Sequence, residues 1–263
     1  MNLTKIEWTD FTWNPVTGCW GPGGTAEKPN RCAYCYAARI AHRMAHVEGS
    51  GYGQGMDFPD PRQAFDPRFH SDRLDQPAKV KKPAKIFVCS MADLFGDWVP
   101  DEWIHPVLTA TEDCNHTFQF LTKNHRRMKD FNPWPPNCWV GATVTNQPDA
   151  DKQLSWLLQV DAPVLFVSHE PLLGQIYLPR WIAGKWTLAG HDHPTEPCKG
   201  LNWAIIGAMT GPGAVKPESA WVQGLIDQYR AAGVPIFLKD NLNWPEKIQE
   251  WPHEMSVLPE KIC

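Results

Sequence analysis

The stretch Pro163-Val-Leu-Phe-Val-Ser168 is a short apolar run, rich in β-branched and aromatic residues, that ends on a small polar side chain. Such near-continuous apolar runs are typical of strands that are buried on both faces, as in parallel sheets. The same kind of run recurs along the chain at 85–90, 116–122, 139–144, 203–207 and 235–239, and an earlier strand is expected at 11–17.

Segments with helical spacing of their apolar residues lie between several of these runs. They are expected at 33–47, 101–112, 147–159 and 218–232, with Asp101 and Pro217 near two starts and Gly233 as a stop. Strands that alternate with helices imply parallel strands joined by right-handed crossovers. About six to seven βα units predict an α/β fold, a partial or full (β/α) barrel of the TIM type, with an open nucleotide-binding sheet as the alternative.

The chain has 263 residues, about the length of one such barrel, so a single domain over 1–263 is expected. Two stretches, near 49–82 and 171–202, interrupt the alternation of predicted strands and helices and are interpreted as insertions. The formal charge of −4 gives no overall attraction to nucleic acid or to an anionic membrane. The sequence has no apolar stretch of membrane-spanning length and no signal peptide, which predicts a cytoplasmic protein without a membrane partner.

Three cysteines lie in the stretch CWGPGGTAEKPNRCAYCY at 19–36, with the spacing C-x12-C-x2-C. Without a secretion signal, such a group favours metal binding or chemistry over disulfides. Cys32 and Cys35 are spaced to face one metal centre, and Cys19 can reach it from the far side of the loop. Structural zinc takes four protein ligands, and no fourth stands at zinc-ribbon spacing. A site with three thiolates would keep one metal position open for chemistry, at the strand ends where barrels keep their active sites.

The stretch Cys32-Ala-Tyr-Cys35 resembles the end of the radical S-adenosylmethionine (SAM) cysteine motif, in which an aromatic residue, here Tyr34, precedes the last cysteine. Most members of that superfamily have three residues between the first two cysteines, whereas this chain has twelve. The wider sequence is similar, in order, to a phage-associated family of radical-SAM-like proteins described as a domain of unknown function. The motifs that carry this likeness are Lys5-Ile-Glu-Trp-Thr-Asp10, Thr12-Trp-Asn-Pro-Val-Thr-Gly-Cys19, Cys35-Tyr-Ala37, Ser90-Met-Ala-Asp-Leu-Phe95, Leu121-Thr-Lys123, Glu170-Pro-Leu-Leu-Gly174 and Gly211-Pro-Gly-Ala214.

The resemblance implies a [4Fe–4S] cluster held by Cys19, Cys32 and Cys35, with SAM on the fourth iron. One electron into the cluster would cleave SAM to a 5′-deoxyadenosyl radical, which takes a hydrogen atom from a substrate. An electron donor such as flavodoxin or ferredoxin is then the implied partner, and the host cytoplasm is the implied location if the chain is phage-encoded. By analogy, the phage association favours a nucleobase, nucleotide or nucleic acid as the substrate.

Polar residues at successive strand ends are the candidates for binding SAM. Ser90 and Asp93 follow the strand at 85–90, where the superfamily commonly contacts the methionine amino group, and Asp93 is the first choice for that contact. The other candidates are Tyr34, Thr143, Thr145, Asn146, Ser168, Glu170 and Gly207. Structural alternatives are a helix cap or salt bridge for Glu170 and a glycine bulge for Gly207.

Cys89 and Lys239 are the candidates for catalytic residues. Cys89 could donate a hydrogen atom to a product radical, although a cysteine in a strand is more often a small core residue. Lys123, Arg126 and Arg127 are either a phosphate site or an ordinary solvated helix start.

Two rival functions remain open. One is a non-enzymatic, zinc-stabilised module that binds nucleic acid or protein. The other is metal-dependent hydrolysis by His191, His193 and Glu196, since His191, His193 and Cys198 form a second possible metal cluster. If the substrate were a base in duplex DNA, exposed loop tryptophans such as Trp20 or Trp134 could fill the gap left by the flipped base.

Overall fold

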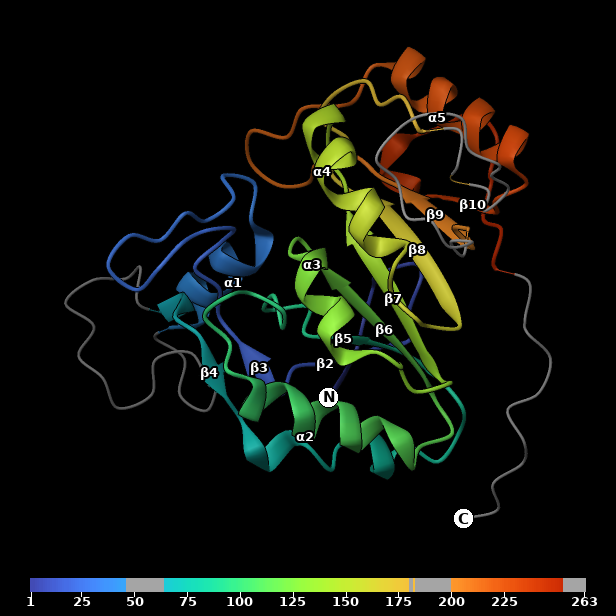
Figure 1. Ribbon diagram of the computed structural model, residues 1–263. Coiled ribbons are helices and arrows are strands. Elements are labelled where there is room, and N and C mark those ends of the chain that lie inside the picture. The colour runs from blue at the N-terminus through green and yellow to red at the C-terminus, as the bar shows by residue number, and fades with distance from the viewer. Residues whose placement is uncertain (46–63, 180–181, 183–199, 253–263) are drawn as a thin grey trace. The chain divides into compact units, whose positions relative to one another are not determined.

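The computed structural model describes residues 1–45, 64–179, 182 and 200–252 of the chain (Figure 1). Two compact units, Met1–Asn124 and His125–Cys263, make up the chain. The candidate cluster of His191, His193 and Cys198 lies outside the described residues, and so does Glu196. A single domain with insertions near 49–82 and 171–202 stays a prediction, because much of both stretches also lies outside them.

The first unit contains four neighbouring strands in the order β1-β2-β5-β6. They are β1 (Asn2–Leu3), β2 (Phe11–Trp13), β5 (Lys85–Val88) and β6 (Thr117–Thr122). Strand β1 runs antiparallel to β2, whereas β2, β5 and β6 are parallel, with Trp13 opposite Val88 and Val88 opposite Phe120. The carboxyl ends of these three parallel strands therefore meet at one edge of the sheet.

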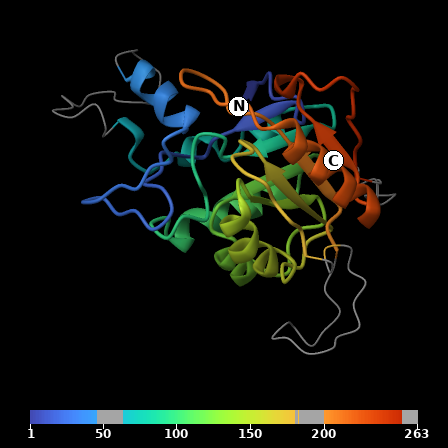
Figure 2. The same ribbon diagram turned by 90° about the horizontal axis from the view of Figure 1, so that it is seen from above.

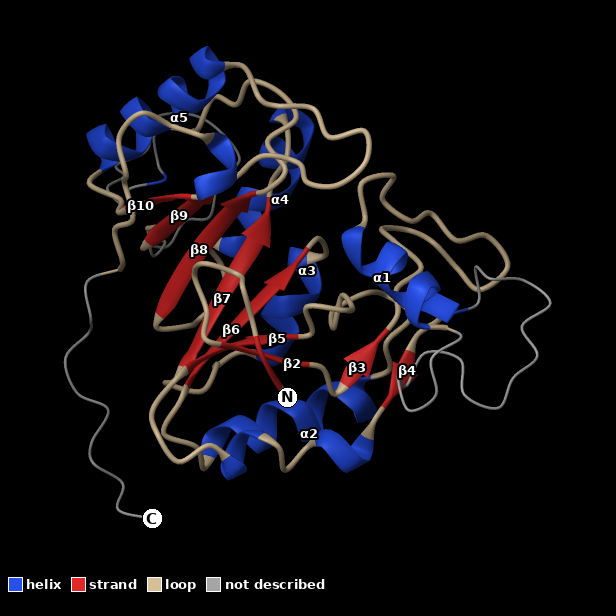
Figure 3. Cartoon of the chain, turned by 180° about the vertical axis from the view of Figure 1, so that it is seen from behind, coloured by secondary structure: helices blue, strands red, loops and turns tan. Residues whose placement is uncertain are grey.

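The strand expected at 11–17 is in fact two strands, so that prediction was wrong. Residues Val16–Thr17 form β3, which pairs antiparallel with β4 (Arg68–Phe69), as Figure 3 shows. The break falls at Asn14 and Pro15 because proline has no N–H for the ladder and the Asn14 side chain bonds elsewhere. The carbonyl Oδ1 of Asn14 accepts the backbone N–H of Met91 at 2.9 Å.

Helices of the first unit are α1 (Tyr36–Met44) and α2 (Asp101–Glu112). Helix α1 begins three residues later than expected because Cys35 is its N-cap, with Sγ accepting the N–H of Ala38 at 3.4 Å. Helix α2 has the predicted bounds, and Asp101 and Glu102 in its first turn suit the positive end of the helix dipole.

The second unit contains four parallel strands in the order β7-β8-β9-β10. They are β7 (Cys138–Thr143), β8 (Val164–His169), β9 (Trp203–Ile206) and β10 (Ile236–Leu238). Every residue of β8, β9 and β10 is buried, as the apolar runs in the sequence predict. Gly141 lets β7 and β8 approach, since a Cβ there would lie 2.4 Å from the Phe166 ring.

Helices of the second unit are α3 (His125–Met128), α4 (Gln147–Leu157) and α5 (Ser219–Ala232). Helix α5 contacts β10 near the C-terminal end of the described chain, which is orange to red in Figures 1 and 2. It ends at Gly233, whose φ of +70° only glycine adopts readily. The predicted α/β class with parallel strands is confirmed. Among the described helices, none is long and apolar enough to cross a membrane.

Candidate metal centre

The segments that follow β2 and β5 run side by side in the first unit. The N–H of Cys89 donates to the carbonyl of Trp13 at 2.7 Å, and the N–H of Gly18 donates to the carbonyl of Met91 at 2.8 Å. These bonds place the start of the cysteine loop against residues 89–93, at the carboxyl ends of parallel strands.

The loop between Cys19 and Cys32 is closed at its base by backbone contacts. The N–H of Asn30 donates to the carbonyl of Trp20 at 2.6 Å. Gly21 has a φ of +83°, and a Cβ at this position would lie 1.9 Å from the carbonyl oxygen of Asn30. Only glycine allows the two sides of the loop to approach so closely.

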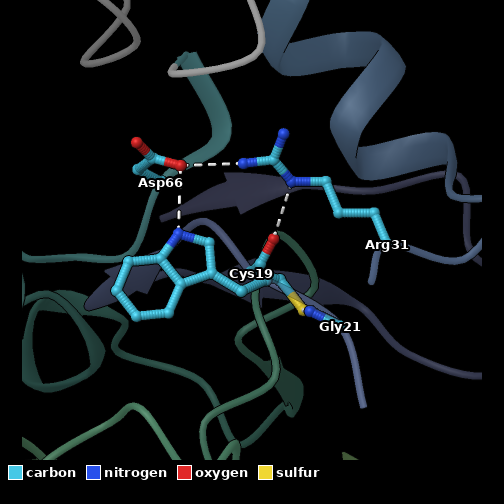
Figure 4. A network of polar contacts seen from close by, with 5 residues as sticks. Cys19, Gly21, Arg31 and Asp66 are labelled. Atoms are coloured by element: carbon cyan, nitrogen blue, oxygen red, sulfur yellow. Dashed lines mark hydrogen bonds and ion pairs between the residues drawn. The ribbon is translucent and has the colours of Figure 1, made fainter. Parts of the chain in front are cut away.

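Side chains hold the base of the loop together as well (Figure 4). The guanidinium of Arg31 donates from Nε to the carbonyl of Cys19 at 3.0 Å and from a terminal nitrogen to Asp66 Oδ1 at 2.8 Å. The same Asp66 oxygen accepts the indole N–H of Trp20 at 3.1 Å. Residues at both ends of the loop therefore share one carboxylate.

Cys19 and Cys35 pack against the same small core cluster, which contains Phe65 and Met91. Burial raises the pKa of the Cys19 thiol far above its usual value, and the negative charges of Asp93, Cys35 and Cys32 raise it further. Burial also raises the pKa of Cys35, and a charge on Cys32 adds to this, whereas the N–H of Ala38 opposes it. Burial and the neighbouring cysteines therefore both disfavour a bare negative charge on Cys19 and on Cys35.

The donor set suits a thiolate-bound metal group. Sulfur ligands must lose their protons on binding, and a cationic centre offsets the burial and the neighbouring charges that raise the pKa values of Cys19 and Cys35. The N–H of Gly21 already donates to Cys19 Sγ at 3.2 Å, as expected near a metal-bound sulfur. In the part of the chain that the structure describes, no three His, Cys, Asp or Glu side chains are yet grouped as a metal site, so binding requires the thiols to turn toward one centre.

Asp93 is held firmly at the strand ends of the first unit. Its Oδ1 accepts the hydroxyl of Thr122 and the N–H of Phe95, and its Oδ2 accepts the N–H of Lys123 at 3.0 Å. Burial raises the pKa of Asp93, and these hydrogen bonds oppose the rise. The carboxylate is therefore fixed in direction between β5 and β6.

Ser90 and Tyr34 lie in the same region as Asp93. The Ser90 hydroxyl donates to Asn14 Oδ1 at 3.2 Å, and the Ser90 carbonyl accepts the hydroxyl of Tyr36 at 2.6 Å. The ammonium of Lys123 lies 5.6 Å from the centre of the Tyr34 ring, within cation–π range. The structure thus brings the predicted residues of the first unit to one edge, together with the cysteines.

The candidate residues of the second unit follow its strands. Asn146 caps α4, its Oδ1 accepting the N–H of Asp149 at 3.0 Å, and the Thr145 hydroxyl donates to Asp149 at 2.6 Å. Thr143 and Ser168 are buried at the ends of β7 and β8. Local capping therefore already uses the polar groups of Asn146 and Thr145.

Glu170 and Lys239 form an ion pair beyond β8 and β10, with side chains 23% and 12% exposed. Gly207 lies beside this pair, since a Cβ there would be 3.0 Å from Lys239 Cδ and 3.1 Å from Glu170. The salt-bridge alternative for Glu170 agrees with this geometry. The pair ties the ends of two strands together around a glycine.

The sequence model of a family described as "Protein of unknown function (DUF5131)" matches residues 3–255. The chain belongs to this family. The expected membership of a family of unknown function is thereby confirmed, while the phage association stays a prediction.

Solved structures of spore photoproduct lyase are similar to this DUF5131 protein at low identity. The lyase in complex with dinucleoside spore photoproduct matches with a TM-score of 0.46 and 14% identity, over 65% of the DUF5131 chain and 48% of its own. A cysteine-to-serine mutant of the lyase matches with a TM-score of 0.43, 15% identity and the same coverage. The DUF5131 chain spans about half the length of these lyase chains. A comparison with curated proteins finds no match.

Two expectations about single residues change with the DUF5131 structure. Trp134 is 5% exposed and its indole N–H donates to the carbonyl of Met128, so its role as an exposed wedge was wrong. Cys89 is buried with a φ of +58°, and burial raises the pKa of its thiol to about 12. This environment favours a role for Cys89 as a small core residue over a role as a hydrogen-atom donor.

Sequence reasoning missed His169, which is buried at the end of β8. Its Nδ1 lies 2.7 Å from the carbonyl of Val144 and must donate to it, so Nε2 accepts the hydroxyl of Tyr229 at 2.6 Å. Burial lowers the pKa of His169 to about 4. A lone histidine after an apolar run gives no indication of a partner 60 residues away.

Proposed function

We propose that this DUF5131 protein is a radical SAM enzyme with a partial (β/α) barrel of the TIM type. Cys19, Cys32 and Cys35 would hold a [4Fe–4S] cluster whose remaining iron binds SAM. The observation that carries the proposal is the position of the three cysteines on one loop that lies against the carboxyl ends of parallel strands, with Cys19 and Cys35 packed on the same core cluster. Such strand ends are where (β/α) folds keep their chemistry.

The bound cluster would supply the electron that cleaves SAM and so starts radical chemistry on a substrate. The protein's own share is to hold the thiolates and to shield them. The N–H groups of Gly21 and Ala38 donate to Cys19 Sγ and Cys35 Sγ, which stabilises negative charge on sulfur. Phe65 and Met91 pack against the same cysteines and restrict water there.

Asp93, Ser90 and Tyr34 are the proposed SAM contacts of the first unit. Asp93 is fixed by bonds to Thr122 and Lys123, so its carboxylate is already oriented when a ligand arrives. Candidates in the second unit stay predictions from the sequence, namely Thr143, Thr145, Asn146, Ser168, Glu170, Gly207 and, as a catalytic residue, Lys239.

The substrate we propose is a nucleobase, nucleotide or nucleic acid, with flavodoxin or ferredoxin as the electron donor in the cytoplasm. The net charge of −4 argues against tight nonspecific binding to duplex DNA. A local contact to a nucleotide is compatible with it.

Anaerobic reconstitution with iron and sulfide tests the proposal. We expect a brown protein with about four irons per chain, whose reduced-cluster EPR signal changes when SAM is added. The signal should be lost in Cys19→Ala, Cys32→Ala and Cys35→Ala. Cys114→Ala is the matched control, because Cys114 lies outside the loop and its thiol donates to the Ala110 carbonyl at the end of α2.

A different outcome would support the zinc-stabilised binding module. One zinc per chain, no iron after reconstitution and no response to SAM would contradict the proposal that the protein is a radical SAM enzyme. In that case a fourth ligand should be found by mutating the remaining His and Cys residues one at a time.

A further inference from the structure

We propose that Arg31, Asp66 and Trp20 form a latch that positions Cys19 next to Cys32 for metal binding. The inference rests on the three-cysteine centre of the proposed function but not on which metal occupies it. Arg31 and Asp66 are positioning residues here, since they act through the backbone that carries the thiols.

The latch addresses a problem set by the length of the loop. Cys19 and Cys32 are thirteen positions apart, compared with four in the usual radical SAM spacing. For a flexible chain, the chance that two ends meet falls with the 3/2 power of the separation, which is about sixfold here. A loop that is already closed in the folded protein avoids this loss.

Arg31 is suited to close the loop because it directly precedes Cys32. Its Nε donates to the Cys19 carbonyl at 3.0 Å, while another nitrogen of the same guanidinium reaches Asp66 at 2.8 Å. Only a planar fork of donors can serve both acceptors at once. The Arg31 side chain is 16% exposed and that of Asp66 38%, so the guanidinium is the better shielded partner of this ion pair.

Asp66 connects the latch to the folded part of the unit. Its Oδ1 accepts from both Arg31 and Trp20, the neighbours in sequence of Cys32 and Cys19 (Figure 4). The preceding residue, Phe65, accepts the N–H of Cys19 through its carbonyl at 2.9 Å and lies under the Arg31 guanidinium. Asp66 and Phe65 therefore hold both sides of the loop in place. The residues they contact are Cys19 itself and the direct neighbours of Cys19 and Cys32.

The third thiol is tied to the second by a turn. The N–H of Cys35 donates to the carbonyl of Cys32 at 2.9 Å, and Cys35 then starts α1. Cys32 and Cys35 therefore stay close without help from the latch. Loss of the latch should therefore separate Cys19 from the pair formed by Cys32 and Cys35.

Titration of the metal-free full-length chain with Co²⁺ under reducing, anaerobic conditions tests this inference. Thiolate-to-cobalt charge-transfer absorption reports how many cysteines bind the metal. We expect Arg31→Gln to lower the affinity for Co²⁺ about tenfold or more, as is usual for residues that support metal ligands. Its spectrum should resemble that of Cys19→Ala, with the absorption of one thiolate lost.

Arg31→Lys keeps the charge but not the fork, so it should recover only part of the affinity. Arg230→Gln removes one arginine from the exposed face of α5 and is the matched control, with no change expected. Thermal unfolding of the metal-free variants shows whether they are folded. A purely structural role of Arg31 would lower the melting temperature while leaving the cobalt spectrum that of three thiolates.

Equal cobalt affinity and spectra in Arg31→Gln and the wild type would overturn the latch. If Arg31→Gln does not fold, Asp66→Asn replaces it, because it keeps an acceptor for Trp20 but loses the charge that holds Arg31. A folded Asp66→Asn variant with unchanged Co²⁺ binding overturns the inference equally.

Failure of the proposed function gives a different result. In one outcome the wild type fails to assemble an iron–sulfur cluster while its Co²⁺ binding still depends on Arg31. In that case the proposed radical SAM function is wrong, and the latch is supported. If the wild type does not bind Co²⁺ through these cysteines, the latch is wrong as well.

Discussion

Acid should destabilise the second unit of this protein through one buried histidine, His169. The imidazole is neutral, with its Nδ1–H donated to the carbonyl of Val144 and its Nε2 accepting the Tyr229 hydroxyl. Protonation of Nε2 would remove that acceptor and bury a charge. This is why burial lowers the pKa of His169 from 6.5 to about 4.

The size of the effect follows from the difference between the folded and unfolded pKa values. Between pH 6.5 and pH 4 the unfolded chain binds a proton at His169 that the folded chain does not. The free energy of unfolding therefore rises with pH in this window and is constant above it, as far as His169 is concerned. The shift of His169 corresponds to a loss of about 3 kcal/mol on going from pH 7 to pH 4.

Urea unfolding at several pH values between 7 and 4, in the wild type and in His169→Gln, measures this loss. The glutamine amide can donate to Val144 and accept from Tyr229 but does not titrate. Its curve should therefore be flatter than that of the wild type by about 3 kcal/mol over the range. His70, whose pKa burial also lowers to about 4, contributes equally to both proteins. Parallel pH dependences in the two proteins would refute the reasoning.

Two glycines beside the candidate residues should respond differently to alanine. Gly21→Ala combines a φ of +83° with a Cβ only 1.9 Å from the Asn30 carbonyl, so it should cost more than the roughly 1–2 kcal/mol of left-handed strain and also weaken Co²⁺ binding. Gly207→Ala meets the side chains of Lys239 and Glu170 at 3.0–3.1 Å, and because side chains can move, thermal unfolding should report a loss of only about 1 kcal/mol.

Control glycines separate strain from close contact. Gly23 has a φ of +67°, and a Cβ at this position would have no other atoms within 4 Å, so alanine there should cost only the strain of the backbone. Gly224 lies within α5 in open space, and alanine there should raise stability by about 1 kcal/mol. If Gly21→Ala and Gly23→Ala behave alike, the approach of the loop sides is not what requires glycine at position 21.

Strands β5 to β10 and most helix bounds could be predicted because their sequence pattern is local. Runs such as 163–168 are apolar enough to be buried on both faces, and β8 has that property in the structure. The start of α1 was missed because cysteine is not among the preferred N-cap residues, although Cys35 serves as one. The break after β2 was not predicted, although Pro15 indicates it, because proline cannot donate a hydrogen bond to a neighbouring strand.

Of the candidate site, only the three cysteines stand out in the sequence. The spacing of the cysteines is a property of one short segment, whereas Arg31 and Asp66 are 35 positions apart and nothing in the sequence pairs them. His169 and Tyr229 are more distant still. The cap formed by Asn146 and Asp149 was a local signal, since an Asn three residues before an Asp at a helix start is a common cap.

The closed base of the cysteine loop has a consequence for how such proteins are searched for and how they evolve. Pro22 and Gly24 still contact the base of the loop, whereas residues 25–29 lie beyond it, so insertions or deletions at 25–29 leave the base as it is. Relatives should then differ widely in the number of residues between the first two cysteines and still place them alike. A search pattern that fixes this number would miss them, whereas one that asks for a glycine two positions after the first cysteine and an arginine directly before the second would find them.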